Sequence, residues 1–378
     1  MTPAAPIASV RWRPWRIPLR EPIVTGAGDM TERQGLIVRV ETADGATGTG
    51  ECSPLPGEGL STADLAARMA ELGRKLLGRT PADAWTSLPA GEHVPVADVG
   101  IETALADLLA GACGAPLAHW LADQTGLPAP ASAPIPANAL LSALDPATLA
   151  REAEAAKACG FRTVKVKVGR DRAADTERLR AVRAAVGPDL GIRIDANGAW
   201  SEQEAVAALV EHAAHGVALC EQPVAPGPDA PARLARVRAA SPVPIAADES
   251  CASLHDLRSL VDAEAVDAVV IKPLRTGLRE ALAMIREATV RNLPCILTTT
   301  FDTGAGTALA LHLAALLPEP RSACGLATLL LLAGDIVRGC PTPEAGSLPL
   351  PTGPGLGVTL DEAALDRFPT GPWEGVSA

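Results

Sequence analysis

Short β-branched stretches alternate with Ala-, Leu- and Arg-rich stretches of helical spacing from residue 135 to about residue 326. Strands and helices that alternate in this way predict a parallel sheet. The predicted strands are 138–141, 163–168, 191–195, 217–220, 244–247, 268–271, 295–299 and 323–326. The predicted helices between them include 175–185, 201–215, 234–240 and 278–291. Repeated strand–helix units in this number favour a closed barrel over an open sheet.

The region before this repeat has a mixed pattern. Residues 10–19 and 36–41 are typical of strands, and residues 47–52 can pair back onto the second of them through a tight turn. Residues 61–77 and 97–121 have helical apolar spacing. We therefore predict an α/β protein with an α+β capping domain at 1–125 and a (β/α)7–8 TIM-type barrel at 126–338. The Pro- and Gly-rich segment 339–378 is expected to return to the capping domain.

Composition and charge narrow the class of protein. Hydrophobic residues make up 48% and charged residues 20%, so the chain can bury a large core. The net charge of −11 disfavours nucleic-acid binding, and no apolar stretch reaches the ~18 residues that a membrane span needs. The eight cysteines are scattered, which argues against a zinc or CxxC site and indicates reduced thiols in the cytoplasm. A small-molecule partner is expected, and a homo-oligomer is left open.

An ionisable side chain stands at the end of each of five successive predicted strands. These residues are Lys165 and Lys167, then Asp195, Glu221, Asp248 and Lys272. From Lys167 onward they follow one another at intervals of 24 to 28 residues, which is about one strand–helix unit of a barrel. The sequence therefore predicts that their charges meet at the carboxyl-terminal face of the barrel, where such barrels have their active sites.

Three converging carboxylates would repel one another unless a cation lay between them. An all-oxygen ligand set suits Mg²⁺, with Mn²⁺ as a substitute. Lys165 and Lys167 are two residues apart and point to the same side of their strand, with Lys272 opposite them. Like charge and the nearby cation are expected to lower the pKa of these lysines. The predicted chemistry is removal of a proton next to a carboxylate by a lysine, with the metal stabilising the ene-diolate.

Five short segments at these strand ends resemble the enolase superfamily, in particular its muconate-lactonising subgroup. They are Val-Lys-Val-Lys at 164–167, Ile-Asp-Ala-Asn at 194–197, Cys-Glu-Gln-Pro at 220–223, Asp-Glu-Ser at 248–250 and Ile-Lys-Pro at 271–273. The segment 353–358 is similar to the one that returns to the family's capping domain. Within the subgroup, residues 50–57 resemble the capping loop of o-succinylbenzoate synthases, and 298–300 and 325–329 lie where those enzymes have similar segments.

This resemblance implies roles for individual residues. Lys167 would be the base and Lys272 the opposing cation, with Lys165 beside the base. The Mg²⁺ ligands would be Asp195, Glu221 and Asp248. From the residues themselves, Asn197 is expected either to contact the ligands or to serve as a turn residue. Glu249 is expected to lie behind the ligand Asp248 and to pair with Lys165. The implied substrate contacts are Thr25, Pro54, Leu55, Pro56, Gly57, Thr298, Thr299, Thr300, Gly325 and Leu326.

The implied reaction is the dehydration of a cyclohexadiene carboxylate to o-succinylbenzoate, a carbon–oxygen lyase step of menaquinone synthesis. N-acylamino acid racemases, cycloisomerases and dipeptide epimerases of the subgroup use the same intermediate and stay open as alternatives. Dipeptide epimerases carry paired Asp residues on the eighth strand, whereas 324–328 contains no acid. Ala327 stands where an Asp is common, and threonines at 298–300 replace serines. A Schiff-base aldolase built on Lys272 and a scaffold without activity are the remaining classes.

Two further motifs carry weaker expectations. His212 and His215 share a face of a predicted helix and are expected to be solvated. Gly304 and Gly306 open the helix after the seventh predicted strand, where barrels often bind phosphate or another anion such as a substrate carboxylate. The loop after the first strand, at Gly26 and Gly28, is expected to be a lid or a simple turn.

Overall fold

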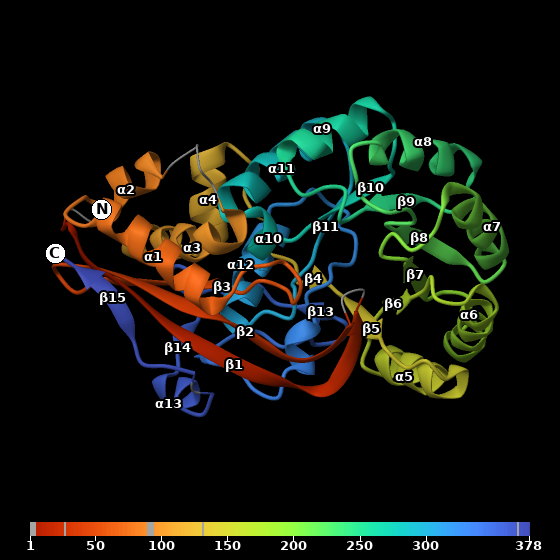
Figure 1. Ribbon diagram of the computed structural model, residues 1–378, viewed down its shortest axis with the longest axis horizontal. Coiled ribbons are helices and arrows are strands. Elements are labelled where there is room, and N and C mark those ends of the chain that lie inside the picture. The colour runs from red at the N-terminus through yellow and green to blue at the C-terminus, as the bar shows by residue number, and fades with distance from the viewer. Residues whose placement is uncertain (1–4, 26–27, 89–93, 131, 369) are drawn as a thin grey trace.

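The computed structural model describes residues 5–25, 28–88, 94–130, 132–368 and 370–378, without the side chains of 24, 25 and 28. It has two parts: a curved antiparallel sheet with helices on one side, and a barrel of parallel strands with helices outside (Figure 1). The predicted α/β fold with a TIM-type barrel and a capping domain is confirmed. The limits of the three predicted chain segments stay a prediction.

The capping sheet has the strand order β15-β1-β2-β3. Its strands are β1 (Ile7–Thr25), β2 (Gly28–Thr42), β3 (Thr47–Cys52) and β15 (Glu374–Ser377). The helices of this part are α1 (Thr62–Leu76), α2 (Pro81–Ser87), α3 (Pro95–Ala112) and α4 (Leu117–Thr125). Helix α3 lies so close to β3 that a Cβ at Gly48 or Gly50 would be 2.0 Å from a helix carbonyl oxygen. Glycine is therefore required at both positions.

The barrel sheet has the strand order β11-β10-β9-β8-β7-β6-β5, and all its pairs are parallel. Its strands are β5 (Asn138–Leu141), β6 (Thr163–Lys167), β7 (Gly191–Asp195), β8 (Val217–Glu221), β9 (Ile245–Ala247), β10 (Ala268–Ile271) and β11 (Cys295–Leu297). The eighth predicted strand, 323–326, forms single bridges in place of a regular strand. Cys324 bridges to Ala137 and Gly325 bridges to Thr298, which closes the ring.

Helices cover the outside of the barrel (Figure 1). They are α5 (Pro146–Ala158), α6 (Arg172–Val186), α7 (Glu202–Ala213), α8 (Ala230–Ala240), α9 (Leu254–Asp262), α10 (Pro273–Thr276), α11 (Leu278–Val290) and α12 (Gly304–Ala314). Most begin at a Ser, Thr or Asp that accepts a hydrogen bond from the first turn, as Asp145 and Asp171 do. A small apolar cluster of Leu219, Ala246, Ala268, Val270 and Ile296 comes from positions on neighbouring strands β8 to β11.

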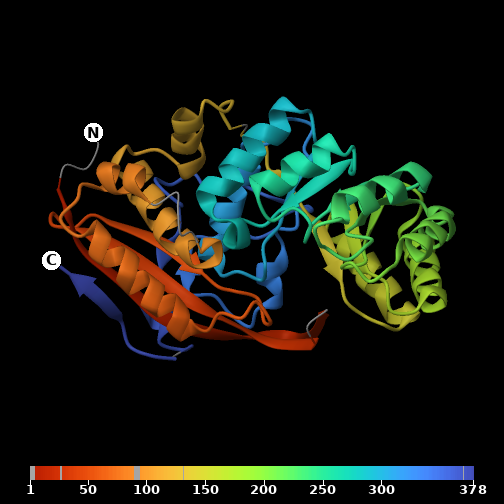
Figure 2. The ribbon, with the colours of Figure 1, turned by 45° about the horizontal axis from the view of Figure 1, so that its top comes forward.

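The chain returns to the capping part at its end. The remaining short elements are β4 (Ile135–Pro136), a 3₁₀ helix at Thr328–Leu331, β12 (Val337–Arg338), β13 (Ser347–Leu348), β14 (Thr359–Leu360) and α13 (Glu362–Leu365). Strand β15 then pairs antiparallel with β1, with Ser377 opposite Ser9. The far ends of β1 and β2 reach the barrel beside β5 in both views (Figures 1 and 2). Among the described residues, no helix has the length and apolar character to cross a bilayer.

Candidate active site

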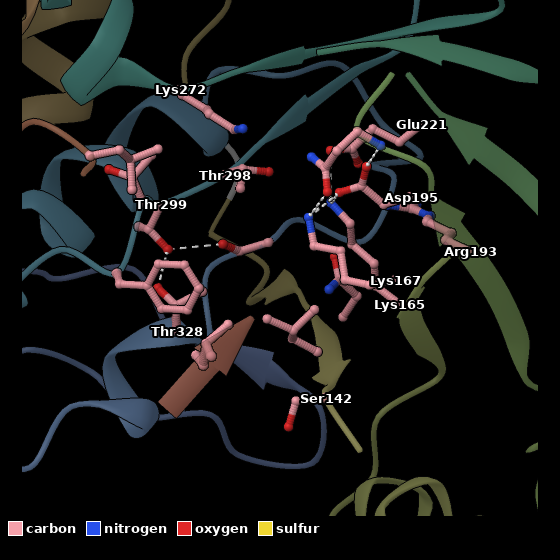
Figure 3. A pocket seen from close by; sticks show the side chains of 18 of the residues that line it. Ser142, Lys165, Lys167, Arg193, Asp195, Glu221, Lys272, Thr298, Thr299 and Thr328 are labelled. Atoms are coloured by element: carbon pink, nitrogen blue, oxygen red, sulfur yellow. Dashed lines mark hydrogen bonds and ion pairs between the residues drawn. The ribbon is translucent and has the colours of Figure 1, made fainter. Parts of the chain in front are cut away.

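A cavity of about 420 Å³ lies at the carboxyl ends of the barrel strands, under the capping part (Figure 3). Its charged lining includes Lys165, Lys167, Arg193, Asp195, Glu221, Glu249 and Lys272. Its apolar lining includes Ile23 and Leu55 from the capping part, and Leu140, Leu141, Ile296 and Phe301 from the barrel. The cavity thus has one ionic wall and one apolar wall, and it can take a small molecule that has both characters.

The parallel register brings the ionic residues together. Lys167, Asp195 and Glu221 are the last residues of β6, β7 and β8, and they lie opposite one another in the sheet. Asp248 directly follows β9, and Lys272 directly follows β10. Because strand ends of a barrel face the same way, these side chains converge as the residue spacing predicts.

Lys165 and Lys167 lie beside the acids of β7 and β8 at the strand ends (Figure 3). Lys165 Nζ is 2.8 Å from Asp195 Oδ2 and 2.7 Å from Glu221 Oε1. Lys167 Nζ is 2.7 Å from the same Asp195 oxygen, and Lys272 Nζ is 2.5 Å from Asp248 Oδ2. Within the described part of the chain, no three His, Cys, Asp or Glu side chains are arranged to hold a metal ion. A cation shared by the carboxylates would have to replace some of these ammonium contacts.

Burial and charge act against each other in this cluster. Burial alone would raise the pKa of Asp195, but the ammonium groups of Lys165 and Lys167 hold it well below its usual range. Burial and the charge of Asp195 raise the pKa of Glu221 to about 8. Burial alone would lower the pKa of Lys165. The surrounding carboxylates raise this pKa by more than burial lowers it, so the net shift is upward. The pKa of Lys272 is raised as well, because carboxylates face its ammonium group. The lowering predicted for Lys165 and Lys167 depends on a nearby cation and stays a prediction.

Asn197 connects the two sides of the ionic wall. Its φ of +44° makes it a turn residue, and its backbone N–H donates to Asp195 Oδ1 at 3.0 Å. Its side-chain oxygen accepts from Lys167 Nζ at 2.6 Å, and its Nδ2 donates to Glu249 Oε1 at 2.9 Å. Glu249 therefore pairs with Asn197, and the predicted pairing with Lys165 is wrong. The other oxygen of Glu249, Oε2, is buried and has no partner among the described residues.

The sequence prediction overlooked the role of Gln222, although its position after Glu221 was evident. Gln222 is fully buried and has a φ of +42°. Its Oε1 accepts from the backbone N–H groups of Asp248 and Ser250 at 2.9 and 3.1 Å. The side chain thereby fixes the turn that carries Asp248. The signal in the sequence that could have indicated this role is a polar residue directly after a strand-end acid.

Most of the predicted substrate contacts line the cavity. Those that do are Leu55, Pro56, Gly57, Thr298, Thr299, Thr300 and Gly325. Pro54 and Leu326 are not part of the described lining, and the Pro54 carbonyl instead accepts from Arg33 at 2.6 Å. The side chain of Thr25 and the tip of the predicted lid at Gly26 lie outside the described residues. Asp248 lines a smaller cavity of about 290 Å³ together with Lys272.

Further residues that line the main cavity were not predicted. They are Asn138, Ser142, Arg170, Arg178, Arg193, Arg275, Phe301 and Thr328, among others. Arg193 stands two residues before Asp195 on β7, so the period of two places both on the same face. It donates to the carbonyl oxygen of Ala323 at 2.6 Å. Its spacing from Asp195 was a signal that could have found it.

The anion site expected at the start of α12 is filled by the protein itself. The backbone N–H groups of Thr303 and Gly306 donate to Glu51, at 3.2 and 3.0 Å. The N–H of Gly304 donates to Asp335 Oδ1 at 2.9 Å. Because side-chain carboxylates already occupy these donors, a phosphate or substrate carboxylate would have to displace them.

The prediction that both histidines are exposed to solvent is wrong for His212. Its side chain is fully buried, and its ring centroid is 6.1 Å from that of Trp200. Neither ring nitrogen has a hydrogen-bond partner among the described residues. Trp200, just before α7, covers this turn of the helix, and that coverage could not be read from helical spacing.

Comparison with known proteins agrees with this geometry. Residues 7–122 match the mandelate racemase / muconate lactonizing enzyme N-terminal domain, and residues 148–364 match the enolase C-terminal domain-like family. A D-Ala-D/L-Ala epimerase of Cytophaga hutchinsonii is 30% identical over 351 residues, which cover 90% of this chain and 92% of that protein. An o-succinylbenzoate synthase of Thermobifida fusca is 40% identical over 238 residues, which cover 62% of this chain and 72% of that protein.

A solved structure extends the likeness to three dimensions. The dipeptide epimerase of Cytophaga hutchinsonii, in complex with Mg and the dipeptide D-Ala-L-Val, superimposes with a TM-score of 0.87 at 28% identity. The match covers 98% of this chain and all of the epimerase chain. Both parts of the molecule thus have counterparts in one family. This chain is an enzyme of the enolase superfamily, in its muconate-lactonising subgroup.

Proposed function

We propose that this enzyme removes a proton next to a carboxylate of its substrate, with Lys167 as the base and Lys272 as the opposing cation. The observation that carries the proposal is that both ammonium groups line one cavity, with Lys167 at the end of β6 and Lys272 directly after β10. The buried acids Asp195, Glu221 and Asp248 come from the strands between them in the sheet order. A base must lie within hydrogen-bonding reach of the proton that it takes. A substrate carbon held between the two lysines would meet that condition.

We propose Mg²⁺ as the cofactor, with Mn²⁺ as a substitute. Asp195, Glu221 and Asp248 would hold it, since they are buried carboxylates on consecutive strands and offer only oxygen. The donor set fits a cation because the pKa of Glu221 is raised to about 8 by burial and by Asp195, and because Glu249 Oε2 is buried without a partner among the described residues. When bound, the ion supplies positive charge that stabilises the anion left by proton removal.

The overall reaction that we propose is dehydration to o-succinylbenzoate. The α C–H bond breaks and its proton passes to Lys167, which acts as the neutral amine. The neighbouring C–O bond then breaks, and the hydroxide leaves as water with the proton that the Lys167 ammonium group returns. The apolar wall of Ile23, Leu140 and Phe301 suits a cyclohexadiene ring. The 40% identity to the synthase of Thermobifida fusca supports this substrate.

N-acylamino acid racemisation is the second candidate. Relatives that match 90% of the chain act as epimerases, and lysines on both sides of the cavity could serve the two faces of a stereocentre. A dipeptide carries a free ammonium group, which needs an anion to hold it. The segment 324–328 offers none, and Glu58 in the lining is already paired with Arg275 at 2.6 Å. An acylated amine needs no such partner, so we favour N-acyl substrates over dipeptides.

The test is a direct assay in the presence of Mg²⁺ and after its removal with EDTA. The cyclohexadiene precursor should be converted to o-succinylbenzoate, and activity should return when Mg²⁺ is added back. Parallel samples in D₂O with N-succinyl amino acids and with dipeptides should be followed by NMR for α-proton exchange. Exchange without any dehydration would replace the lyase with the racemase. Activity that survives EDTA, together with borohydride trapping on Lys272, would instead point to Schiff-base chemistry.

A further inference from the structure

We infer that Asp175 and Arg178, on the outer helix α6, are positioning residues that hold the backbone at Lys167 in place for proton transfer. The inference rests on the proposed role of Lys167 as the base. Neither residue belongs to the ionic cluster of the strand ends, and both lie on the helix that follows β6. The observation behind the inference is where their hydrogen bonds go.

The two side chains form hydrogen bonds to the backbone on both sides of Val168. Arg178 Nη2 donates to the carbonyl oxygen of Lys167 at 2.8 Å. Asp175 Oδ2 accepts from the backbone N–H of Gly169 at 2.7 Å. Arg178 Nη2 also donates to Asp175 Oδ1, which joins the two side chains. One buried ion pair therefore satisfies the polar backbone groups where β6 ends and the turn to α6 begins.

The burial of this pair requires an explanation beyond helix stability. The side chains of Asp175 and Arg178 are 1% and 7% exposed. The same helix carries a second pair at the same spacing, Glu177 and Arg180, whose side chains are 57% and 65% exposed. Burying two charges costs free energy unless geometry and hydrogen bonding are excellent. The buried pair obtains that geometry through its contacts with residues 167–169, which connects its presence to the strand end.

The same turn sets the position of the neighbouring loop. Gly169 has a φ of +107°, and a Cβ there would lie 2.7 Å from the Cβ of Ala199. The N–H of Val168 donates to the carbonyl oxygen of Asp195 at 2.9 Å. The loop 196–199 also carries Asn197, which accepts from Lys167 Nζ. A shift of residues 167–169 would therefore move the Lys167 amine relative to both of its partners.

A small displacement of a base has a large kinetic cost. Misplacing a reacting group by about 1 Å can lower a rate by about 10²-fold. We expect Asp175→Asn and Arg178→Met to lower kcat by about that factor with little change in KM. Arg178→Lys keeps one donor and should recover part of the loss. The matched controls are Glu177→Gln and Arg180→Met, which break the exposed pair of the same helix and should leave kcat unchanged.

The experiment measures two properties of each variant. The first is kcat and KM with the cyclohexadiene precursor, or with an N-succinyl amino acid if that is the substrate. The second, which needs no substrate, is amide hydrogen exchange of the segment 163–171 by mass spectrometry. Faster exchange at Val168 and Gly169 in Asp175→Asn, absent in Glu177→Gln, would show that the pair holds the turn, even if neither substrate reacts and the proposed function fails.

Three results would overturn the inference. Unchanged exchange in Asp175→Asn would mean that the pair does not hold the turn. Faster exchange with an unchanged kcat would mean that the turn does not position the base. A rise in KM alone for Arg178→Lys would make Arg178 a substrate contact, since it also lines the cavity. If Arg178→Met does not fold, Asp175→Asn and Arg178→Lys decide the question.

Discussion

Two groups of buried acids lie close to each other in this molecule and have opposite surroundings. At the strand ends, Asp195 and Asp248 face lysine ammonium groups, which hold the pKa of both carboxyls below its usual range against the effect of burial. At the junction of β3 with α12, Glu51 and Asp302 rest on backbone N–H and hydroxyl groups. Burial raises the pKa of Glu51 to about 7 and that of Asp302 to about 6.

The contacts of Glu51 explain the difference. Its Oε1 accepts from Ser53 Oγ at 2.9 Å and from the Thr303 backbone, and its Oε2 accepts from Thr303 Oγ1 and from Gly306 N–H. These neutral donors satisfy the carboxyl group without a full opposing charge. The nearby Arg33 donates to the carbonyl oxygens of Ser53 and Pro54. Asp195 and Asp248 thus face full positive charges, which a metal ion could replace. Glu51 instead faces neutral donors and joins β3 to the start of α12.

Removing an ammonium group from the strand ends should have the largest effect. We expect Lys167→Met to lower the rate of α-proton removal by about 10³-fold, since a positioned base contributes ~10²- to 10⁴-fold. Asp195 keeps Lys165 as its partner, so the fold should persist. The rate is measured by product formation or by exchange in D₂O. Thr303→Val, which removes a donor from the junction, serves as the control and should change stability more than rate. A Lys167→Met enzyme with a tenth of the wild-type rate would contradict the assignment.

The next largest effect that we expect is a dependence of the free energy of unfolding on pH, which comes from Glu51 at the junction. The pKa of Glu51 is raised from its ordinary 4.5 to about 7, so the folded protein holds a proton that the unfolded chain has released. This stabilisation is complete below pH 4.5 and is lost as the pH rises through 7. The shift corresponds to about 3 kcal/mol in the free energy of unfolding, and Glu51→Gln should remove that dependence. Urea unfolding at pH 5 and pH 8 measures it, and parallel pH curves for the two proteins would disprove it.

The effect of Mg²⁺ on stability should depend on the strand-end acids and not on the junction acids. A ligand at about 100 times its dissociation constant adds about 2.7 kcal/mol to the free energy of unfolding. We expect Mg²⁺ to raise the Tm of the wild-type protein and of Glu51→Gln alike. Asp195→Asn should lose most of this increase, because it removes one of the three proposed ligands. An equal Mg²⁺ effect in Asp195→Asn would place the ion elsewhere.

The strand-end group could be predicted because its determinants are periodic. Lys167, Asp195 and Glu221 each close a short apolar strand, and the interval between them equals one barrel unit. Strand pairing then places them side by side without any knowledge of loop structure. The fold class followed from the same repeat, but this periodicity did not describe the closure of the barrel by isolated bridges at Cys324 and Gly325.

The junction and the outer contacts could not be predicted for physical reasons. Glu51 binds backbone N–H groups of α12, and nearly every residue offers such a donor, so no side-chain pattern marks the pair. Glu249 turns to Asn197 because the loop there takes a positive φ, which the residue identity permits but does not require. His212 is covered by Trp200 from outside its own helix. In each case the partner is set by packing between separate elements of the fold.

The smallest expected effect concerns the contact that joins the capping loop to the barrel. Glu58 Oε1 is 2.6 Å from Arg275 Nε, and Glu58 Oε2 accepts from the backbone N–H of Leu55 at 2.7 Å. Glu58 thus ties Leu55 to α10, which begins directly after Lys272. The pair is partly exposed, so Glu58→Gln should lower the free energy of unfolding by less than about 1 kcal/mol.

The kinetic consequence of Glu58→Gln should fall on substrate binding. Because the new amide oxygen could still accept from the Leu55 N–H, we expect the loop to keep its turn and KM to rise by a few-fold, with kcat close to that of the wild type. Steady-state kinetics at low and high salt test this, since screening should weaken the wild-type pair and narrow the difference between the two proteins. A loss in kcat as large as that of Lys167→Met would contradict this, because it would show that the capping loop positions the reacting atoms and does not only bind the substrate.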